Sequence, residues 1–307
     1  MAVSGAVSVI IPARNAEATI ARAIASALGQ TSPPAEIIVI DDASTDHTAG
    51  RAQAAGGALT RVIALPRRTG AAAARNAGID AATGEFIAFL DADDAWDATK
   101  TERQLAVMAR HPAMTFCACR ARHVAEDGRA IGPIHGGVPV ATGPEAWRAL
   151  LAENFIATPC VLARRAAVVA AGGFDPSLPV AEDQDLWIRL ALAGEVGFVE
   201  EVLVTVQDRP GSLSREYAGR TAAVTLAMVL GHIERQRARL SRAERRHALG
   251  ARYTQNGRRF YRGGDWRTGM RCLFLAMAHG HAVGTNLWYL VTAAPALAGL
   301  KRWLRRS

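Results

Sequence analysis

Three carboxylates crowd the end of one apolar run, in the stretch GEFIAFLDADDAW at residues 84–96. Asp91, Asp93 and Asp94 lie so close in sequence that their charges repel one another, and burial strengthens that repulsion. Hard oxygen donors suit Mg²⁺ or Mn²⁺, ions that usually share their coordination with phosphate oxygens. We therefore expect a divalent cation at Asp91 and Asp93, which would face the same side of a strand. The alternative is a solvated turn of acidic caps that opens the next helix.

Two more acidic pairs occur elsewhere. Asp41 and Asp42 end the apolar run EIIVIDD, where a carboxylate would accept hydrogen bonds from a base or a ribose hydroxyl, or would instead cap a local turn. Glu182 and Asp183 precede an apolar helical face in AEDQDLWIRLALAG. One of them would act as a general base on an acceptor hydroxyl, unless both only complement the helix dipole.

One basic residue and one amide stand between these acidic groups. Arg75 and Asn76, in the stretch ARNAG, are expected to contact phosphate or to hold a carboxylate of the site. A structural salt bridge is the alternative.

Apolar runs alternate with helical periodicity through the first hundred residues. Four buried strands are predicted, at residues 7–12, 35–42, 58–65 and 85–94. Strands that alternate with helices predict a parallel sheet with right-handed crossovers, whose ligands bind at the carboxyl ends of the strands. The polar clusters at 12–14, 41–42 and 91–93 all follow such ends. They therefore predict one site on one rim of the sheet.

The later chain is less regular. A strand and turn are predicted at 114–130, a helix after residue 181, and mainly helices from about residue 216. The net charge of +8 is uneven, because residues 233–307 hold 16 Lys and Arg against 3 Asp and Glu. Such a basic tail would be drawn to nucleic acid or to an anionic membrane. Since no nucleic-acid motif accompanies it, no nucleic-acid partner is expected.

The last segment, residues 282–307, joins an apolar stretch to a cationic end. It is marginal in length for a membrane span. It is expected either to lie on an anionic membrane surface or to pack against the catalytic domain or a partner chain, which leaves a homo-oligomer open. The four cysteines show no metal-ligand spacing and predict reduced thiols in a reducing compartment. The short stretch before residue 7 leaves no room for a secretory signal peptide, so a cytoplasmic location is expected.

The chain resembles family 2 glycosyltransferases, inverting enzymes with the nucleotide-sugar-binding fold called GT-A. Four motifs carry the resemblance, in the family's order and over residues 5–215: VSVIIPARNAEATI, EIIVIDDASTDHT, ARNAGIDAATGEFIAFLDADDAW and GGFDPSLPVAEDQDLWIRLALAG. The resemblance implies that Asp91, Ala92 and Asp93 contact the donor diphosphate, the two carboxylates through Mn²⁺ or Mg²⁺. It implies Asp183 as the catalytic base, with Glu182 second.

The same resemblance assigns the nucleoside pocket. Asp42, with Asp41 beside it, is expected to bind the nucleoside, and the base pocket is expected to be lined by Pro12, Ala13, Arg14 and Glu17. Arg14 stands where the family often has Tyr, and an arginine plane also stacks on a base.

A second departure from the family pattern occurs near residue 209. Arg209 stands where the family often has His, and an arginine there contacts phosphate but does not ligate a metal.

These observations predict a GT-A-like α/β domain over residues 1–218, with a mostly parallel mixed sheet flanked by helices, and a basic helical region over 219–307. The expected activity is inverting transfer from a nucleotide-sugar, UDP-sugar first, to a saccharide or lipid-linked acceptor in surface polysaccharide or glycoconjugate synthesis. The expected location is cytoplasmic and peripheral at the inner face of the membrane. A nucleotidyltransferase of related fold and a non-catalytic nucleotide-sugar or partner-binding protein are the alternatives.

Overall fold

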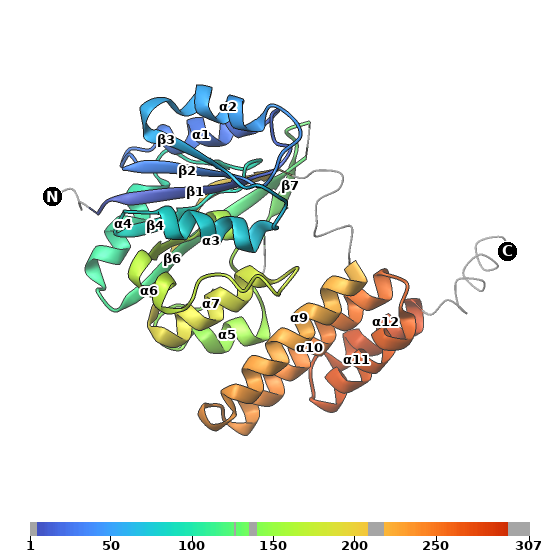
Figure 1. Cartoon of the computed structure of the whole chain (residues 1–307). Helices are drawn as coiled ribbons and strands as arrows, with labels where there is room; N and C mark the ends of the chain where they lie inside the picture. The colour runs from blue at the N-terminus through green and yellow to red at the C-terminus, as the bar shows by residue number, and fades with distance from the viewer. Residues whose placement is uncertain (1–4, 126, 135–139, 208–217, 294–307) are drawn as a thin grey trace. The chain divides into compact units, whose positions relative to one another are not determined.

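The computed structural model describes residues 5–125, 127–134, 140–207 and 218–293 (Figure 1). The chain divides into two compact units, Met1–Trp147 with Phe155–Pro210, and Arg148–Asn154 with Gly211–Ser307. The segment Arg148–Asn154 groups with the second unit, and the domain boundary after residue 218 stays a prediction from sequence.

The first unit is built on one mixed sheet. Over the described residues the sheet has nine strands in the order β3-β2-β1-β4-β8-β6-β9-β5, with β7 paired to β6. The strands are β1 (Val7–Ala13), β2 (Glu36–Asp41), β3 (Thr60–Ala64), β4 (Phe86–Phe89), β5 (Ala95–Trp96), β6 (Met114–Val124), β7 (Ala130–Pro133), β8 (Leu162–Arg164) and β9 (Glu195–Gln207).

Strand direction changes across this sheet. β1 runs parallel to β2 and β4, and β2 runs parallel to β3. β8 is antiparallel to both β4 and β6, while β6 and β9 are parallel. The predicted α/β fold with a mixed sheet is therefore confirmed. Because the parallel strands β1, β2 and β4 are neighbours, their carboxyl ends meet at one rim.

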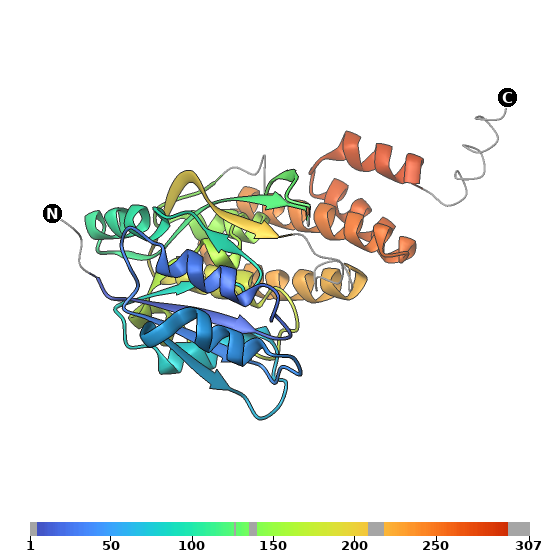
Figure 2. The ribbon, with the colours of Figure 1, turned by 90° about the horizontal axis from the view of Figure 1, so that it is seen from above.

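Helices cover both faces of the sheet (Figures 1 and 2). The helices of this unit are α1 (Ile20–Leu28), α2 (Thr48–Gly56), α3 (Ala71–Ala81), α4 (Lys100–Arg110), α6 (Arg165–Ala170) and α7 (Glu182–Ala193). Val9 and Ile11 of β1 share a buried core with Ile24 of α1. Ile10, between them, faces the other side, where a Cβ on Gly78 of α3 would lie 2.4 Å from its side chain. The close approach of α3 to β1 therefore requires a glycine at residue 78.

A cluster of buried aromatic rings fixes α7 against the sheet. The ring of Phe89, at the end of β4, lies 5.2 Å from that of Phe174 and 6.0 Å from that of Trp187. Phe116 of β6 lies 5.6 Å from Trp187. Such ring contacts add to the free energy of burial. The first turn of α7 is thereby held next to the end of β4.

The second unit is helical. Its helices include α9 (Ala218–Arg235), α10 (Arg242–Arg262), α11 (Trp266–Ala278) and α12 (Val283–Ala293), and part of α5 (Ala146–Ala152) belongs to it. Ser241 begins α10 with a capping box to Glu244. The buried Arg252 donates hydrogen bonds of 2.6 Å to the carbonyls of Leu150 and Leu151. Burial, with the charge of Arg259, lowers the pKa of Arg252 to about 9.

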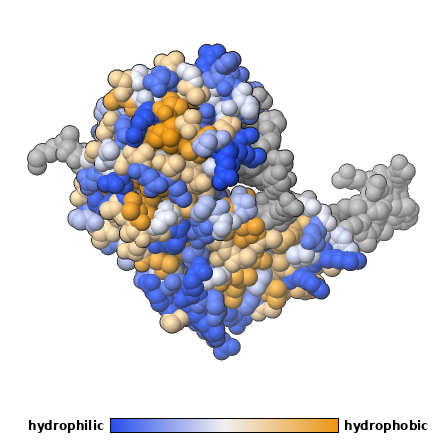
Figure 3. Space-filling model, in the orientation of Figure 1, coloured by the Kyte–Doolittle hydropathy of each residue, from blue (hydrophilic) through white to orange (hydrophobic). Residues whose placement is uncertain are grey.

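Among the described residues no helix has the length and apolar character needed to cross a membrane. Hydrophobic and hydrophilic residues alternate over the visible face of the helical unit (Figure 3). The helical prediction for the later chain is confirmed by α9 to α12, which together follow residue 217. The segment 294–307, with the predicted cationic end, lies outside the described residues.

Candidate functional site

Arg75 stands at the centre of the site. Its Nη2 lies 2.8 Å from a carboxylate oxygen of Asp91, and its Nη1 lies 2.9 Å from a carboxylate oxygen of Glu182. The side chain is buried, and its guanidinium lies 5.3 Å from the ring of Phe174. Burial by itself would lower the pKa of Arg75, but the charges of Asp91 and Glu182 raise it above its usual value. The guanidinium is therefore charged, and its two ion pairs join the turn after β4 to the first turn of α7.

The acidic pair lies in the first turn of α7, which starts at Glu182 after Ala181 in the left-handed region, with φ of 63°. The hydroxyl of Thr158 donates to Oδ2 of Asp183 at 3.4 Å. Burial and the neighbouring charge of Glu182 raise the pKa of Asp183 to about 7. A carboxyl with this pKa accepts and releases a proton near neutral pH, as a general base must. Asp185 is ion-paired to Arg189 at 2.7 Å.

The DADD segment lies in a turn. β4 ends at Phe89, and the backbone N–H of Asp94 donates to the carbonyl of Asp91 at 3.1 Å. The expectation that Asp91 and Asp93 share one side of a strand was therefore wrong, because the strand ends before them. Ala92 is buried in the core, and Arg22 donates to the carbonyl of Asp93.

Asp94 closes this turn and is buried. It accepts a hydrogen bond of 3.1 Å from the backbone N–H of Gln207. Burial, and then the charges of Asp91 and Asp93, raise its pKa well above the usual range. The turn thus concentrates negative charge.

Asp41 and Asp42 lie at the end of β2 and accept hydrogen bonds from nearby protein groups. The carboxylate of Asp42 accepts from Thr69 N at 2.6 Å, Thr69 Oγ1 at 2.9 Å and Gly70 N at 2.9 Å. Asp41 accepts from the backbone N–H of Ser44 at 3.1 Å and from its hydroxyl. Both residues are buried, and Asp42 ties the end of β2 to the segment before α3.

The segment after β1 lies beside these carboxylates. Pro12 and Ala13 pair in register with Ile40 and Asp41, and Arg14 donates to the carbonyl of Asp42 at 3.1 Å. These contacts bring the ends of β1 and β2 together.

Glu17 lies slightly further along the chain, beside the segment before α2. Its carboxylate accepts from the backbone N–H of His47 at 3.0 Å, and its own N–H donates to Asp46 at 3.1 Å. Glu17 therefore joins the segments that follow β1 and β2.

Asn76 supports the loop that precedes α7. Its Nδ2 donates to the carbonyl of Phe174 at 2.8 Å, and its Oδ1 accepts from the N–H of Phe174 at 2.8 Å. Gly173 has φ of +68°, and a Cβ there would lie 2.6 Å from Oδ1 of Asn76. Both amide atoms of Asn76 are therefore engaged with the backbone of this loop.

Sequence reasoning missed four residues that the structure brings to the site. Arg22, Thr158, Phe174 and Gln207 contact Asp93, Asp183, Arg75 and Asp94, respectively. None belongs to a short motif of charged residues, so their spacing carried no signal. Arg209, predicted to contact phosphate, lies outside the described residues.

The DADD turn offers oxygen donors that suit a divalent cation. Among the described residues, no three His, Cys, Asp or Glu side chains are placed to hold a metal ion by themselves. Mg²⁺ and Mn²⁺ bound with phosphates need only one or two protein carboxylates. Asp91 and Asp93 lie in one turn beside the buried Asp94, whose pKa is raised first by burial and then by the charges of these two residues. These carboxylates therefore fit a cation that a donor diphosphate would share.

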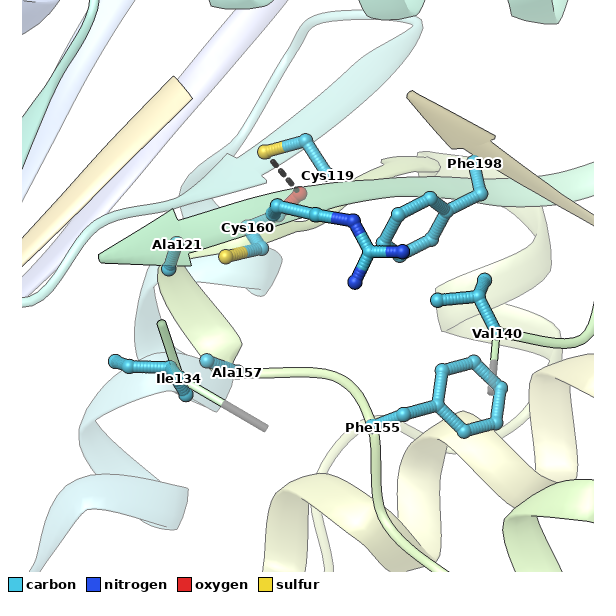
Figure 4. Close-up of a pocket in the computed structure, with 9 residues that line it drawn as sticks. Cys119, Ala121, Ile134, Val140, Phe155, Ala157, Cys160 and Phe198 are labelled. Atoms are coloured by element: carbon cyan, nitrogen blue, oxygen red, sulfur yellow. Dashed lines mark hydrogen bonds between the residues drawn. The ribbon is translucent and has the colours of Figure 1, made fainter. Parts of the chain in front are cut away.

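A small cavity elsewhere in the first unit has no part in this site. Its volume is about 10 Å³, and its lining includes Cys119, Cys160, Phe155 and Phe198 (Figure 4). The thiol of Cys119 lies 3.6 Å from the carbonyl oxygen of Cys160. All four cysteines are free and buried. The cavity holds no more than a water molecule, and none of the predicted site residues lines it.

Curated relatives match parts of the chain. The UDP-Glc:alpha-D-GlcNAc-diphosphoundecaprenol beta-1,3-glucosyltransferase WfgD of Escherichia coli is 41% identical over 105 residues, covering 34% of this chain and 42% of WfgD. The putative teichuronic acid biosynthesis glycosyltransferase TuaG of Bacillus subtilis is 42% identical over 113 residues, covering 36% of this chain and 45% of TuaG. The chain thus spans less than half the length of either relative.

Solved structures share the fold. TarS of S. aureus in complex with UDP-GlcNAc matches with a TM-score of 0.69 and 21% identity, over 94% of this chain and 82% of TarS. The mannosyltransferase PcManGT of Pyrobaculum calidifontis, in complex with GDP-Man and Mn²⁺, matches with a TM-score of 0.62 and 20% identity, over 97% of this chain and 83% of PcManGT. The predicted GT-A-like fold is confirmed by these neighbours. Residues 8–171 match the family described as Glycosyl transferase family 2, more than half of the chain. The chain therefore belongs to glycosyl transferase family 2.

Proposed function

We propose that this glycosyltransferase moves a sugar from a nucleoside-diphosphate donor to an acceptor hydroxyl with inversion at the anomeric carbon. The observation that carries the proposal is the network in which Arg75 bridges Asp91 and Glu182, immediately before Asp183 with its pKa of about 7. This network connects the carboxylates expected at the donor diphosphate to the expected base. It supports a site that binds the donor diphosphate and the acceptor hydroxyl next to each other.

UDP-sugar is the proposed donor. The name of WfgD states UDP-Glc as its substrate, and the TarS structure holds UDP-GlcNAc. The mannosyltransferase neighbour holds GDP-Man, which makes a GDP-sugar the alternative. Asp42 and the segment 12–17 would hold the nucleoside, with the guanidinium of Arg14, bonded to the carbonyl of Asp42, stacking on the base.

Asp183 would remove the proton from the acceptor hydroxyl. The resulting oxygen nucleophile attacks the anomeric carbon from the face opposite the nucleotide, and the bond to the diphosphate breaks with its electron pair leaving on the phosphate oxygen. A single displacement inverts the configuration and needs no protein nucleophile. Arg75 is ion-paired to Glu182 at 2.9 Å, and burial first, then the charge of Glu182, raise the pKa of the base Asp183.

Asp91 and Asp93 would hold the divalent cation together with the donor diphosphate. A bound Mn²⁺ or Mg²⁺ supplies Lewis-acid neutralisation of the charge on the departing diphosphate. Arg209 is proposed to contact the same phosphates.

The proposed acceptor is a saccharide or lipid-linked hydroxyl in surface polysaccharide or glycoconjugate synthesis. Support comes from the names of WfgD, which includes a diphosphoundecaprenol-linked sugar, and of TuaG, which includes teichuronic acid biosynthesis. A cytoplasmic location at the inner face of the membrane would suit such acceptors. The family match favours glycosyl transfer over nucleotidyl transfer or a purely binding role.

Replacing the base tests the proposal directly. We expect Asp183→Asn to lower transfer by at least about a hundredfold, because base catalysis contributes about 10²–10⁴-fold, and to leave nucleotide binding intact. Asp127→Asn, at a carboxylate with 69% of its surface exposed, is the matched control and should leave transfer unchanged. NMR of the product's anomeric proton would report its configuration. Full turnover of Asp183→Asn would rule out this base, and retained configuration would rule out the single displacement.

A further inference from the structure

The second unit contains a cavity that the proposed transfer reaction does not use. Its volume is about 500 Å³, and it lies where the start of α10 meets the turn between α11 and α12. It is lined by Arg242, Ala243, Arg246, His247, His279, Gly280 and His281. Five of these seven residues carry a cationic or protonatable side chain, and none is acidic.

The positive charge in this cavity is not offset by carboxylates. Within the described part of the chain, neither Arg242 nor Arg246 forms an ion pair or a side-chain hydrogen bond. Glu244, on the same turn of α10, is ion-paired to Arg148 at 2.8 Å and accepts from the N–H of Ser241. The nearest acidic side chain along the helix is therefore already engaged.

The histidines are held in place by their neighbours. Nδ1 of His281 lies 3.0 Å from the hydroxyl of Thr254, and its ring lies 5.7 Å from that of His247. The ring of His279 stacks on Tyr253 at 6.0 Å. Burial lowers the pKa of both His279 and His281, and the remaining causes are nearby cations, Arg246 for His279 and His247 with Arg258 for His281. The cavity thus has a positive potential and oriented ring nitrogens.

We propose that this cavity binds a phosphate-bearing group. Two unpaired guanidinium groups supply the planar, bidentate donors that recognise phosphate, and the imidazoles supply further donors. A volume of about 500 Å³ exceeds that of a single small ion and suits a diphosphate or the headgroup of a phospholipid. The lining uses only residues of the second unit and none of the residues proposed for the donor site.

Exposed apolar residues beside the cavity favour a lipid as the source of the phosphate. Val283 and Leu287 of α12 are 47% and 54% exposed, and Phe274 of α11 is 57% exposed. α11 ends at Ala278 and α12 begins at Val283, so these two helix ends flank His279–His281. Cations next to exposed aromatic and aliphatic side chains suit the headgroup and acyl boundary of an anionic bilayer. A soluble phosphorylated compound would use the cavity and leave these side chains in water.

The test compares two double variants of the full chain. Arg242→Gln with Arg246→Gln removes the cavity cations, and Arg267→Gln with Arg271→Gln removes the same charge from exposed positions on α11 that do not line the cavity. Since all four side chains are exposed, both variants should keep the melting temperature of the wild type. Each protein is titrated calorimetrically with inorganic pyrophosphate at low salt, and sedimented with vesicles of phosphatidylglycerol or of phosphatidylcholine alone.

We expect the cavity variant to lose at least about tenfold in affinity for pyrophosphate at this site and for phosphatidylglycerol vesicles, with the control variant near wild type. If the cavity variant loses affinity for phosphatidylglycerol vesicles, the phosphate comes from a lipid headgroup. Loss for pyrophosphate alone, with no vesicle binding by any protein, identifies a soluble phosphorylated compound. Equal binding by the two variants in both assays would overturn the proposal. Pyrophosphate bound at the donor site does not interfere, because both variants keep that site.

Discussion

Arg75 and Glu182 lie 107 residues apart in sequence, yet their side chains form an ion pair of 2.9 Å between α3 and the first turn of α7. The second ion pair of Arg75, to Asp91 at 2.8 Å, extends this connection to the turn after β4. One buried guanidinium therefore links the segment of the expected base to the expected donor carboxylates, in addition to the aromatic cluster that packs α7 against the sheet.

Removing Arg75 should damage both stability and transfer. In Arg75→Met, two carboxylates lose their buried partner, and we expect a loss of about 3–5 kcal/mol in the free energy of unfolding, with transfer lowered at least about tenfold. Urea denaturation and donor turnover measure the two effects. Arg103→Met is the control, because Arg103 and Glu201 form an exposed pair at 3.7 Å that contributes less than about 1 kcal/mol. Wild-type stability in Arg75→Met would show that the buried pairs contribute nothing.

The rate of transfer should rise with pH around neutrality. Asp183 must be ionised to accept a proton, and its pKa is raised to about 7. We therefore expect kcat/KM to increase about tenfold per pH unit below pH 7 and to level off above it. A pH profile of initial rates, with donor binding measured separately at each pH, checks this. A flat profile between pH 5.5 and pH 8 would contradict the role of Asp183.

The same pKa predicts a gain in stability when the charge is removed. The pKa of Asp183 is higher in the folded state than its ordinary value of 3.8, so the folded state binds more protons between about pH 4 and 7. Ionisation of Asp183 thus destabilises the fold as pH rises through this window. Asp183→Asn should therefore melt several degrees higher than wild type at pH 8, since each kcal/mol shifts the melting temperature by about 2–4 °C, and at pH 4 the difference should vanish. Asp127→Asn should show no such pH-dependent gain.

Asn76 should act through the loop that it holds. Asn76→Ala leaves the N–H and carbonyl of Phe174 without their partners, which we expect to cost about 2–4 kcal/mol of unfolding free energy. Because this loop leads into α7, kcat should fall more than the donor KM rises. Calorimetry and steady-state kinetics separate the two effects. A large rise in donor KM with unchanged stability would instead support the predicted direct contact with the donor.

Metal should be required for tight nucleotide binding. With Mn²⁺ present, a saturating nucleoside diphosphate should raise the melting temperature, since it binds only the folded state. EDTA, or the change Asp93→Asn, should remove most of this shift, whereas Asp127→Asn should not. A panel of UDP, dTDP, GDP and CMP also identifies the donor class. An equal shift with and without metal would contradict the predicted site at Asp91 and Asp93.

Much of the first unit was predictable from local pattern. Apolar runs of strand length, separated by helical periodicity, predicted β1 to β4 and the helices between them. Strands and helices can be predicted from such patterns because their periods depend on residues that are close in the chain. The polar groups at residues 12–14, 41–42 and 91–93 follow these strands, so parallel pairing alone brought them to one rim.

What the sequence determined by itself is thus the class of the fold, the rim and the acidic motifs on it. Only the tertiary structure decided the contacts of Arg75, the support of Phe174 by Asn76, the turn that holds Asp91 and Asp93, and the cationic cavity between α10 and the α11–α12 turn. Each joins residues far apart in the chain or depends on where a strand stops. Such contacts arise when packed elements meet, and the pKa values of Asp183 and Asp94 then follow from the burial and charges that this packing creates.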